Sequence, residues 1–549
     1  MSQGSPQIAF PAGAAPKQRD IIAAQKIIAD ISSGVYRSPA AAIKELVSNA
    51  YDADATRVTI STDPPHLRTF TITDDGSGMS VDDFLDVMAH IGGSRKRVAG
   101  DVSPIFKRRL IGRIGIGLLA VAQLGTKFYI SSKKKGSNTR FLAEINLEPF
   151  HKDDTALLSM SAAKGAKEGE VTIGAIRYVP DIPDEVSSHF TVISVPDAKK
   201  GLSSEITGLA RRAVGATDVM SVKNGVRPFS DIITMTSSTK RADLVLDNYF
   251  YMLWELGLLA PVDYLSGSPF SGAKRTIIDW EKIKLPQPTG FALLVDGVSV
   301  HRPQRFPNPS AVDYSSPDPK VYDLSYEKNI ANRPLRLSGY IYFQQPGIVP
   351  EELKGIHIRI RDVGIGGYDK SWLGYPFDEG LKFGQVTVEV FVEEGLESAL
   401  NIDRDSFRET DVHFQALRAY IWDELRKNVF PDFKARQNAF RTARKNEQKN
   451  VANQVFEDAL LELPATDSAQ LSSGVALLTA LRATEHDQMA TGDAPVPTWD
   501  AIVSRNSLSS DAQDRFEKVL RVLMSSELLV GVVKDDLENV LNALAIAVK

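Results

Sequence analysis

The 549-residue sequence contains no cysteine, which excludes disulfide bonds, cysteine metal sites and a thiol nucleophile. No Gly-Lys dipeptide occurs, so the chain has no P-loop for binding phosphates. No apolar run reaches the roughly 18 residues that a membrane-spanning helix needs. Residues 1–18 lack the charged and apolar regions of a signal peptide. We therefore expect a cytoplasmic protein that has no membrane partner.

Metal-binding patterns and a strong net charge are also missing. The eight histidines show no spacing that is typical of a metal site. A formal net charge of −5 gives no general attraction to nucleic acid, although it does not exclude local basic patches. The hydrophobic content of 43% and the charged content of 24% are those of a globular protein. The length fits about three to four domains.

The stretch 38–120 contains three segments whose residue types suit a bound nucleotide. The first segment, 38–52, predicts a helix, because a serine that can cap the helix is followed by proline at the first helical position. Glu45, Asn49 and Asp52 are spaced so that they lie on one face of this helix. A carboxylate and a carboxamide there could activate a water and hold a metal ion. The alternative is the solvated polar face of an ordinary amphipathic helix.

The second segment is a strand, 69–73, that ends in a glycine turn. Asp74 at the strand end could accept a hydrogen bond from an exocyclic amine such as that of adenine. The sequence that follows contains Gly76 and Gly78, which would let the backbone turn sharply and approach a flat ligand closely. The alternative is a plain Asp-Gly turn, which is common.

The third segment, 112–117, is rich in glycine and precedes an apolar helical run. Glycine-rich backbone at the N-terminus of a helix is where proteins bind phosphate groups. Its sequence also mimics a dinucleotide fingerprint, but residues 109–112 make a poor strand before it. We therefore interpret the segment as a phosphate loop.

In this order, ELVSNAYDA, DDGSGM and GRIGIG resemble the three nucleotide motifs of the GHKL ATPase superfamily. This superfamily includes gyrase, the ninety-kilodalton heat-shock chaperone, histidine kinase and MutL. The sequence looks closest to a heat-shock-chaperone-like or MORC-like branch. The resemblance implies a two-layer α/β sandwich of the Bergerat type that binds ATP with Mg²⁺. No histidine precedes the nucleotide helix, so the adjacent phosphoacceptor of a histidine kinase is missing.

The resemblance assigns roles to individual residues. It makes Glu45 the general base that orients the attacking water, Asn49 the Mg²⁺ ligand and Asp74 the partner of the adenine amine. Thr191 is then a residue that supports Asp74. The remaining ATP-binding residues implied by the resemblance are Asp52, Ala53, Gly76, Gly78, Met79, Ser94, Lys96, Gly112, Arg113, Ile114, Gly115, Ile116 and Gly117.

Residues 92–111 form a candidate lid over the phosphates. The glycines at its start supply flexibility, and the phosphate loop ends it. Three of its arginines have no role by the resemblance, and we expect them to be solvated side chains that keep the lid soluble. These are Arg97, Arg108 and Arg109.

The segment VEVFVEEGLESALNIDRDSF, residues 388–407, resembles a stretch of the heat-shock chaperone's middle domain. There, an arginine reaches the ATP site and contacts the terminal phosphate, which makes Arg404 a second catalytic residue by resemblance. A guanidinium suits this task because it is always charged and can donate to two oxygens at once. The alternative is an ion pair of Arg404 with Asp403 or Asp405.

The whole pattern predicts an α/β fold with a GHKL sandwich, a mixed α/β transducer-like middle domain and an all-α C-terminal region. We divide the chain into a flexible arm (1–18), the ATP-binding domain (19–200), the middle domain (201–410) and the helical region (411–549). Strands are expected at 57–61, 69–73, 128–132, 139–147, 170–178, 189–195, 289–300, 335–345, 356–361 and 385–393. A helix is expected at 20–31, a linker at 266–272 and a proline-rich loop at 303–334.

These features predict an ATPase that works as a conformational switch, most simply a homodimer. ATP closes the lid, Arg404 senses the terminal phosphate, and slow hydrolysis releases the domains. Three functions fit this switch. The first is chaperone-like remodelling of an unidentified protein partner or client. The second is a DNA-acting clamp of the MutL or MORC kind, in bacterial repair or defence against phage. The third is a nucleotide-sensing scaffold with little turnover.

Overall fold

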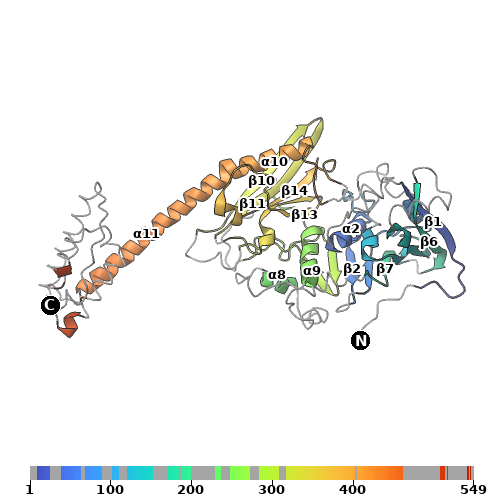
Figure 1. Ribbon diagram of the computed structural model, residues 1–549, viewed down its shortest axis with the longest axis horizontal. Coiled ribbons are helices and arrows are strands. Elements are labelled where there is room, and N and C mark those ends of the chain that lie inside the picture. Colours follow the sequence, from blue (N-terminus) through green and yellow to red (C-terminus); the bar gives the residue numbers. More distant parts are fainter. Residues whose placement is uncertain are drawn as a thin grey trace. The chain divides into compact units, whose positions relative to one another are not determined.

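The computed structural model describes the larger part of the chain (Figure 1). The described residues are 9–24, 39–63, 68–89, 102–110, 120–151, 170–184, 187–199, 229–236, 248–272, 283–307, 317–345, 347–401, 405–461, 507, 509–513, 516, 541–542 and 545. The chain forms two compact units, Met1–Pro431 and Asp432–Lys549. The first unit contains two β-sheets, which confirms the predicted mixed α/β fold.

The first sheet has nine described strands in the order β1-β6-β5-β4-β7-β3-β2-β8-β9. All neighbouring pairs are antiparallel except β2 and β8, which are parallel. The strand bounds are β1 Lys17–Ala24, β2 Arg57–Ser61, β3 Phe70–Asp74, β4 Lys127–Lys133, β5 Thr139–Asn146, β6 Glu170–Pro183, β7 Phe190–Val195, β8 Ala292–Val295 and β9 Val298–Val300.

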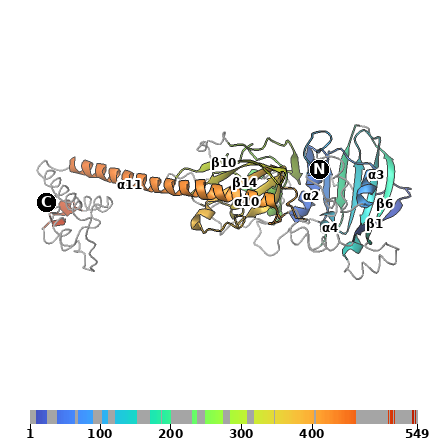
Figure 2. The same cartoon turned by 90° about the horizontal axis from the view of Figure 1, so that it is seen from above.

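Helix α2 (Pro39–Asp52) forms where the sequence predicted it, and its apolar face is part of the core of the first unit. The buried side chains on that face include Ile43 and Val47, both fully inaccessible to solvent. Burying each such side chain contributes roughly 1.5–3 kcal/mol. A second helix, α9 (Asn248–Leu259), packs against α2 and also against the second sheet. Figure 1 shows both helices between the two sheets, and Figure 2 shows α2 there in the view from above.

Three short helices complete the frame of the first sheet: α3 (Val81–Ala89), α4 (Val121–Leu124) and α8 (Phe229–Thr236). Ser80 caps α3. Its hydroxyl accepts a hydrogen bond from the N–H of Asp83 at 3.2 Å, and the Asp83 carboxylate accepts one from the Ser80 N–H at 3.0 Å. Such reciprocal bonds satisfy two donors that the first turn of a helix leaves without partners.

The helix predicted over 20–31 is wrong for residues 20–24, which belong to β1; residues 25–31 lie outside the described part. In β1, Ile21 is fully buried whereas its neighbour Ile22 is 39% exposed, as expected when successive side chains point to opposite faces. The strand pairs along its whole length with β6. This distant partner overrides the local helical preference.

The second sheet has five described strands in the order β10-β11-β14-β12-β13. Only β12 and β14 pair in parallel. The strand bounds are β10 Lys320–Ile330, β11 Arg333–Phe343, β12 Gly355–Ile360, β13 Val363–Asp369 and β14 Val386–Glu394. The strands predicted at 335–345, 356–361 and 385–393 are thereby confirmed. Three short 3₁₀ helices lie at Glu148–His151, Glu351–Leu353 and Gly380–Gly384.

The strands predicted at 289–300 exist as β8 and β9, but they extend the first sheet, because β8 pairs with β2. The loop predicted at 303–334 is wrong from Lys320 onward, where β10 and β11 form a long hairpin. Its two turn residues, Ala331 and Asn332, have φ of 48° and 61°, the conformation that suits a two-residue hairpin. The predicted divisions at residues 18, 200 and 410 stay predictions.

The linker predicted at 266–272 is wrong, because residues 268–270 of this segment are buried. Phe270 is 6% exposed, and its ring centroid lies 5.0 Å from that of Tyr340 and 6.0 Å from that of Tyr342. The N–H of Gly272 donates to the Phe306 carbonyl at 2.7 Å. Small and polar residues here allow close packing rather than flexibility.

The helical prediction after residue 411 is confirmed up to residue 461. Asp411 caps α10 (Val412–Glu424), a π-helical turn follows (Leu425–Val429), and α11 spans Phe430–Leu461. The all-α character of residues 462–549 stays a prediction, since most of them lie outside the described part. Within the residues that the structure describes, no helix is both long and apolar enough to cross a membrane.

Candidate active site

Helix α2 presents its predicted polar face to the protein interior. Glu45 is 2% exposed and Asp52 is 5% exposed, while Asn49 is half-buried. The alternative of a solvated polar face is therefore wrong for both carboxylates. A buried carboxylate is stable only where other groups compensate its charge. The site is therefore defined by the groups around Glu45.

Lys44 lies beside Glu45 and is itself only 1% exposed. Its Nζ is 3.3 Å from Glu45 Oε1 and 3.5 Å from Asp405 Oδ1. The side chain of Asp405 is 8% exposed. A single buried ammonium thus joins the predicted general base on α2 to a carboxylate in the segment that follows the second sheet.

This segment, 400–407, is closed at its base into a loop. Leu400 and Phe407 form an antiparallel bridge. Asn401 donates from its N–H to the Ser406 carbonyl at 3.0 Å and from its Nδ2 to the Ser406 hydroxyl at 2.8 Å. Arg404 lies outside the described residues, so its catalytic role stays a prediction. The neighbouring Asp405 contacts α2, so the loop reaches the candidate site.

Asp74 occupies the end of β3, as predicted. Burial raises the pKa of its carboxyl from 3.8 to about 7, because an ionised carboxylate is poorly solvated there. The N–H groups of Gly76 and Thr191 lower this pKa in part, whereas the nearby Asp75 carboxylate raises it further. Asp74 Oδ1 accepts a hydrogen bond from the Gly76 N–H at 2.9 Å. This carboxyl can change its charge near neutral pH.

Thr191 lies directly opposite Asp74 in the antiparallel pair of β7 and β3. Its hydroxyl is 3.0 Å from the hydroxyl of Ser132, which also accepts the N–H of Met79 at 3.0 Å. Thr191 therefore connects to the predicted adenine pocket through Ser132. Sequence reasoning missed Ser132, because a serine in a strand carries no signal for such a bridge.

The predicted glycines of the turn are required by its packing. A Cβ on Gly78, whose φ is +63°, would lie 1.9 Å from the Lys133 carbonyl oxygen. A Cβ on Gly76 would lie 2.9 Å from the Ala53 carbonyl oxygen. That same oxygen accepts hydrogen bonds from the N–H and the hydroxyl of Ser77 at 2.7 and 2.8 Å. The turn is thus fixed between the end of α2 and β4, and close approach of a ligand to it stays a prediction.

The described part of the candidate lid, 102–110, is bound to the C-terminal end of α2. The Asp54 carboxylate accepts hydrogen bonds from the Ser103 hydroxyl at 2.5 Å and from the N–H groups of Ile105 and Phe106 at 2.8 and 3.0 Å. Despite its burial, the pKa of Asp54 is lowered, since these donors and Arg108 stabilise its charged form. This segment is therefore anchored to the end of α2.

Arg108 was predicted to be a solvated side chain, and this is wrong. Its Nη1 donates to the carbonyls of Ala55 at 2.6 Å and Tyr51 at 3.2 Å, and its guanidinium lies 4.2 Å from the centroid of the Tyr51 ring. The carbonyls at the C-terminal end of a helix lack intrahelical partners and attract cations. Arg108 is therefore part of the structural frame of α2.

Arg109 is 45% exposed at its side chain, but it contacts the second sheet. It donates to the Glu393 carbonyl at 3.3 Å and lies 3.6 Å from the Glu394 carboxylate. Arg361 of the second sheet donates to the Leu110 carbonyl and is held by Glu397 at 2.6 Å. The chain just before the phosphate loop is thus attached to the second sheet.

The other predicted lid and loop residues lie outside the described part; they are Ser94, Lys96, Arg97, Gly112, Arg113, Ile114, Gly115, Ile116 and Gly117.

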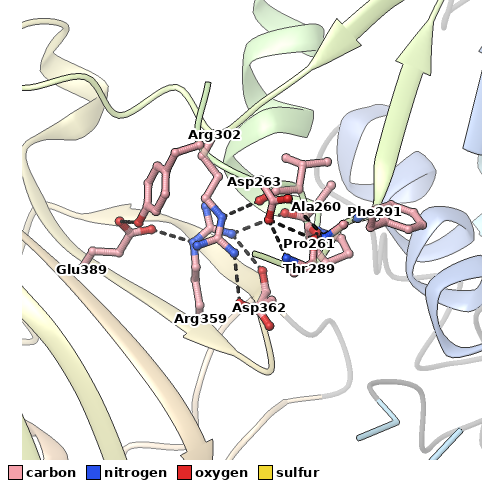
Figure 3. Close-up of polar contacts among 12 residues, drawn as sticks. Ala260, Pro261, Asp263, Thr289, Phe291, Arg302, Arg359, Asp362 and Glu389 are labelled. Atoms are coloured by element: carbon pink, nitrogen blue, oxygen red, sulfur yellow. Dashed lines mark hydrogen bonds and ion pairs between the residues drawn. The ribbon is translucent and has the colours of Figure 1, made fainter. Parts of the chain in front are cut away.

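A buried cluster of charges joins the chain after α9 to the second sheet (Figure 3). Arg359 and Glu389 are fully buried, with Arg359 Nε 2.6 Å from Glu389 Oε1. Arg302 donates to the Val262 carbonyl at 2.6 Å and to Asp362 at 3.0 Å. Nothing in the sequence predicts this cluster, since each of its charged residues looks like a surface residue when only the sequence is known.

Glu389 is the centre of this cluster. Its Oε2 also accepts the hydroxyls of Tyr264 and Tyr340, each at 2.7 Å. Burial alone would raise the pKa of Glu389, but the charges of Arg359 and Arg302 hold it below its ordinary value. A paired and fully hydrogen-bonded carboxylate of this kind fixes the geometry of the elements that supply its partners. The junction between α9 and the second sheet is therefore rigid.

The fold and the ordered motifs define an ATPase domain with a Bergerat-type sandwich. Comparison with known proteins agrees: residues 36–171 match the family described as histidine kinase-, DNA gyrase B- and HSP90-like ATPase. The chain therefore carries a GHKL-type ATPase domain, as predicted. Domains of this superfamily bind ATP and usually Mg²⁺. A specific kinship with the heat-shock chaperone is not among these findings.

Individual relatives include DNA mismatch repair proteins. The chain is 34% identical over 158 residues to the DNA mismatch repair protein MutL of Methanocorpusculum labreanum, covering 28% of this chain and 25% of that protein. It is 35% identical over 107 residues to MutL of Streptococcus uberis, covering 19% and 16%. A Herpetosiphon aurantiacus protein, HgiDII, named provisionally as a type II restriction enzyme, is 28% identical over 233 residues, covering 41% and 33%. The chain thus matches a third or less of each relative's length.

Proposed function

We propose that this protein is an ATPase whose nucleotide cycle controls an action on DNA. The observation that supports the proposal is that residues 36–171, which include the buried Glu45 and the half-buried Asp74, match a GHKL-type ATPase family. The names of the MutL and restriction-enzyme relatives favour DNA over a protein client. The second of the three functions predicted from the sequence is therefore preferred to chaperone-like remodelling.

The residues of the site suit MgATP. The ionised Asp74 would accept a hydrogen bond from the adenine amine. Its Oδ1 accepts a hydrogen bond from the Gly76 N–H, and its pKa of about 7 lets the carboxyl ionise near neutral pH. Among the described residues, no three acidic or histidine side chains converge on a possible metal position. Magnesium would then take its ligands from the Asn49 carboxamide, the phosphates and water, which is its usual preference at nucleotide sites. When bound, MgATP supplies the phosphoanhydride bond that is cleaved.

Glu45 orients the attacking water and accepts its proton in this mechanism. Glu45 is buried on α2, and charge interactions are stronger in such a poorly solvated place than in water. Arg404, next to the Asp405 that contacts Lys44, would donate to the terminal phosphate and stabilise the charge that develops there. We propose that two copies of the chain close together when ATP is bound and separate after hydrolysis.

A DNA-dependent ATPase assay tests the proposal. Purified wild-type protein should hydrolyse MgATP, and duplex DNA should raise the rate. DNA binding measured with ATP should weaken steeply between about 50 and 200 mM salt, because phosphate contacts release counterions. The Glu45→Ala variant should retain ATP binding and lose hydrolysis by about 10²–10⁴-fold.

Two results would count against the proposal. Hydrolysis that a protein extract stimulates but DNA does not would favour the chaperone-like function. ATP binding without turnover, with or without DNA, would favour the nucleotide-sensing scaffold. Light scattering with and without a non-hydrolysable ATP analogue tests the homodimer separately.

A further inference from the structure

Lys44 contacts one carboxylate on α2 and one in the 400–407 loop. Its Nζ is almost equally far from Glu45 Oε1 and Asp405 Oδ1, at 3.3 and 3.5 Å. All three side chains are at most 8% exposed. In such a poorly solvated place, water cannot replace either carboxylate as a partner of the ammonium. A stronger interaction of Lys44 with one carboxylate therefore weakens its interaction with the other.

We propose that Lys44 and Asp405 are positioning residues that make hydrolysis by Glu45 depend on the docked 400–407 loop. The inference rests on the function proposed above and adds the residues that couple the second sheet to catalysis. When the loop contacts α2, the Lys44 ammonium interacts with Asp405 as well as with Glu45. Its attraction for Glu45 is therefore weaker than it would be without Asp405. Glu45 can then still turn toward the attacking water.

Removal of either partner disturbs this balance in a defined way. Without Asp405, the charge of Lys44 is no longer shared with that carboxylate and holds Glu45 on the ammonium, away from the attacking water. Without Lys44, the buried Glu45 carboxylate loses the ammonium that positions it. Both changes act on the chemical step, because none of the three side chains is assigned to the adenine end of the site.

The position of Asp405 depends on a close backbone contact with β13. Gly366 has a φ of +63°, and a Cβ there would lie 2.6 Å from the Asp405 carbonyl oxygen. An alanine at this position would displace the backbone of Asp405 without altering any charge. The glycine thus offers a second, independent way to move the carboxylate away from Lys44.

The experiment is a double-mutant cycle on kcat for MgATP hydrolysis, with ATP affinity measured by calorimetry. Asp405→Asn should lower kcat about tenfold, corresponding to ~1.4 kcal/mol, and leave the Kd for ATP unchanged. Lys44→Met should lower kcat similarly, and Asp405→Asn should add no further loss in that background, since it acts through Lys44. Lys44→Arg keeps the charge and should restore most of kcat.

Two further variants complete the test. Gly366→Ala should reproduce the loss seen with Asp405→Asn, at unchanged ATP affinity. Glu409→Gln, which removes an exposed carboxylate four residues further on, is the matched control and should behave as wild type.

The possible outcomes separate this inference from the function on which it rests. A wild-type protein that does not hydrolyse ATP overturns the proposed function. A wild-type protein that hydrolyses ATP through Glu45, while Asp405→Asn has normal kcat, overturns the inference alone. Additive losses in the double variant would also overturn it, because they would show that Asp405 acts independently of Lys44. If Asp405→Asn does not fold, Gly366→Ala and Lys44→Met decide the same question.

Discussion

Asp74 and Thr191 face each other across the antiparallel strands β3 and β7, and the backbone N–H of Thr191 helps to stabilise the Asp74 carboxylate. This help is insufficient to offset burial, so the pKa of Asp74 rises to about 7. The site thereby holds a carboxyl that is only partly ionised at neutral pH in the absence of a ligand. An adenine amine, which donates a hydrogen bond, would favour the ionised form.

ATP affinity should therefore depend on pH around neutrality. Below about pH 7, binding of the adenine amine requires Asp74 to lose a proton, which costs free energy; above it, the carboxylate is already ionised. The affinity should rise about tenfold between pH 6 and pH 8 and then level off. Calorimetry at saturating Mg²⁺ measures this, and a flat profile would remove Asp74 from the adenine pocket.

Asp74→Asn is the control for this pH dependence, because it retains the titration of ATP itself. The variant should bind ATP more weakly by roughly 1.5–3 kcal/mol, the value of a charged hydrogen bond, and lose the rise between pH 6 and pH 8.

The same variant should make the nucleotide-free protein more stable at pH 8. A carboxyl whose pKa is raised on folding adds most stability below its unfolded pKa, and this contribution is lost as the pH rises to about 7. Asparagine avoids that loss, so the free energy of unfolding should increase by roughly 1–3 kcal/mol at pH 8 and not at pH 4. Urea denaturation at both pH values compares the two proteins.

The nucleotide motifs could be found from the sequence because they are local. The spacing of Glu45, Asn49 and Asp52 needs only a helix to bring them to one face, and the turn after Asp74 needs only its own glycines. What the sequence could not reveal is which distant groups complete the site. Lys44 and Asp405 are far apart in the chain. The resemblance of residues 388–407 predicts that this segment reaches the ATP site, but nothing in the sequence indicates that Asp405 meets Lys44.

The wrong predictions have the same physical origin. Residues 20–24 have helical preferences, but β6 offers them a strand to pair with. Arg108 lies in a basic cluster typical of a solvated loop, yet its partners are backbone carbonyls at the end of α2, which no side-chain pattern records. Buried charges such as Arg359 also look like surface residues until their counter-charge is known. Long-range pairing, rather than local preference, decides each case.

Gly78→Ala should destabilise the turn that carries Met79. The new Cβ would lie 1.9 Å from the Lys133 carbonyl oxygen, and the positive φ of +63° adds backbone strain. We expect a loss of roughly 3–5 kcal/mol in the free energy of unfolding, beyond the usual range for a single substitution. Gly136→Ala is a matched control, because Gly136 also has a positive φ, +81°, but meets no atom within 4 Å. It should cost only about 1–2 kcal/mol from backbone strain.

Arg108→Ala should weaken the anchor between the lid and α2. The change removes two hydrogen bonds to helix-end carbonyls and a contact with the Tyr51 ring, which together are worth roughly 1.5–3 kcal/mol. Arg109→Ala removes a neighbouring, exposed ion pair and should cost less than about 1 kcal/mol. Thermal unfolding of both variants compares them directly, and equal losses would contradict the structural role of Arg108.

Glu389→Gln should be among the most destabilising substitutions in the second sheet. It leaves the fully buried Arg359 without its counter-charge, and breaking a buried pair in this way costs roughly 3–5 kcal/mol. The exposed pair of Glu327 and Arg336 offers the control, since its side chains are 65% and 41% accessible and Glu327→Gln should change stability by less than about 1 kcal/mol.

Because the pKa of Glu389 lies below its ordinary 4.5, the native stabilisation is present above that pH and fades only as the pH falls below it. Urea denaturation should therefore separate the wild type from Glu389→Gln at pH 7, and the gap should narrow in acid. A gap that is independent of pH would mean that the loss reflects packing around Tyr264 and Tyr340 rather than the charge.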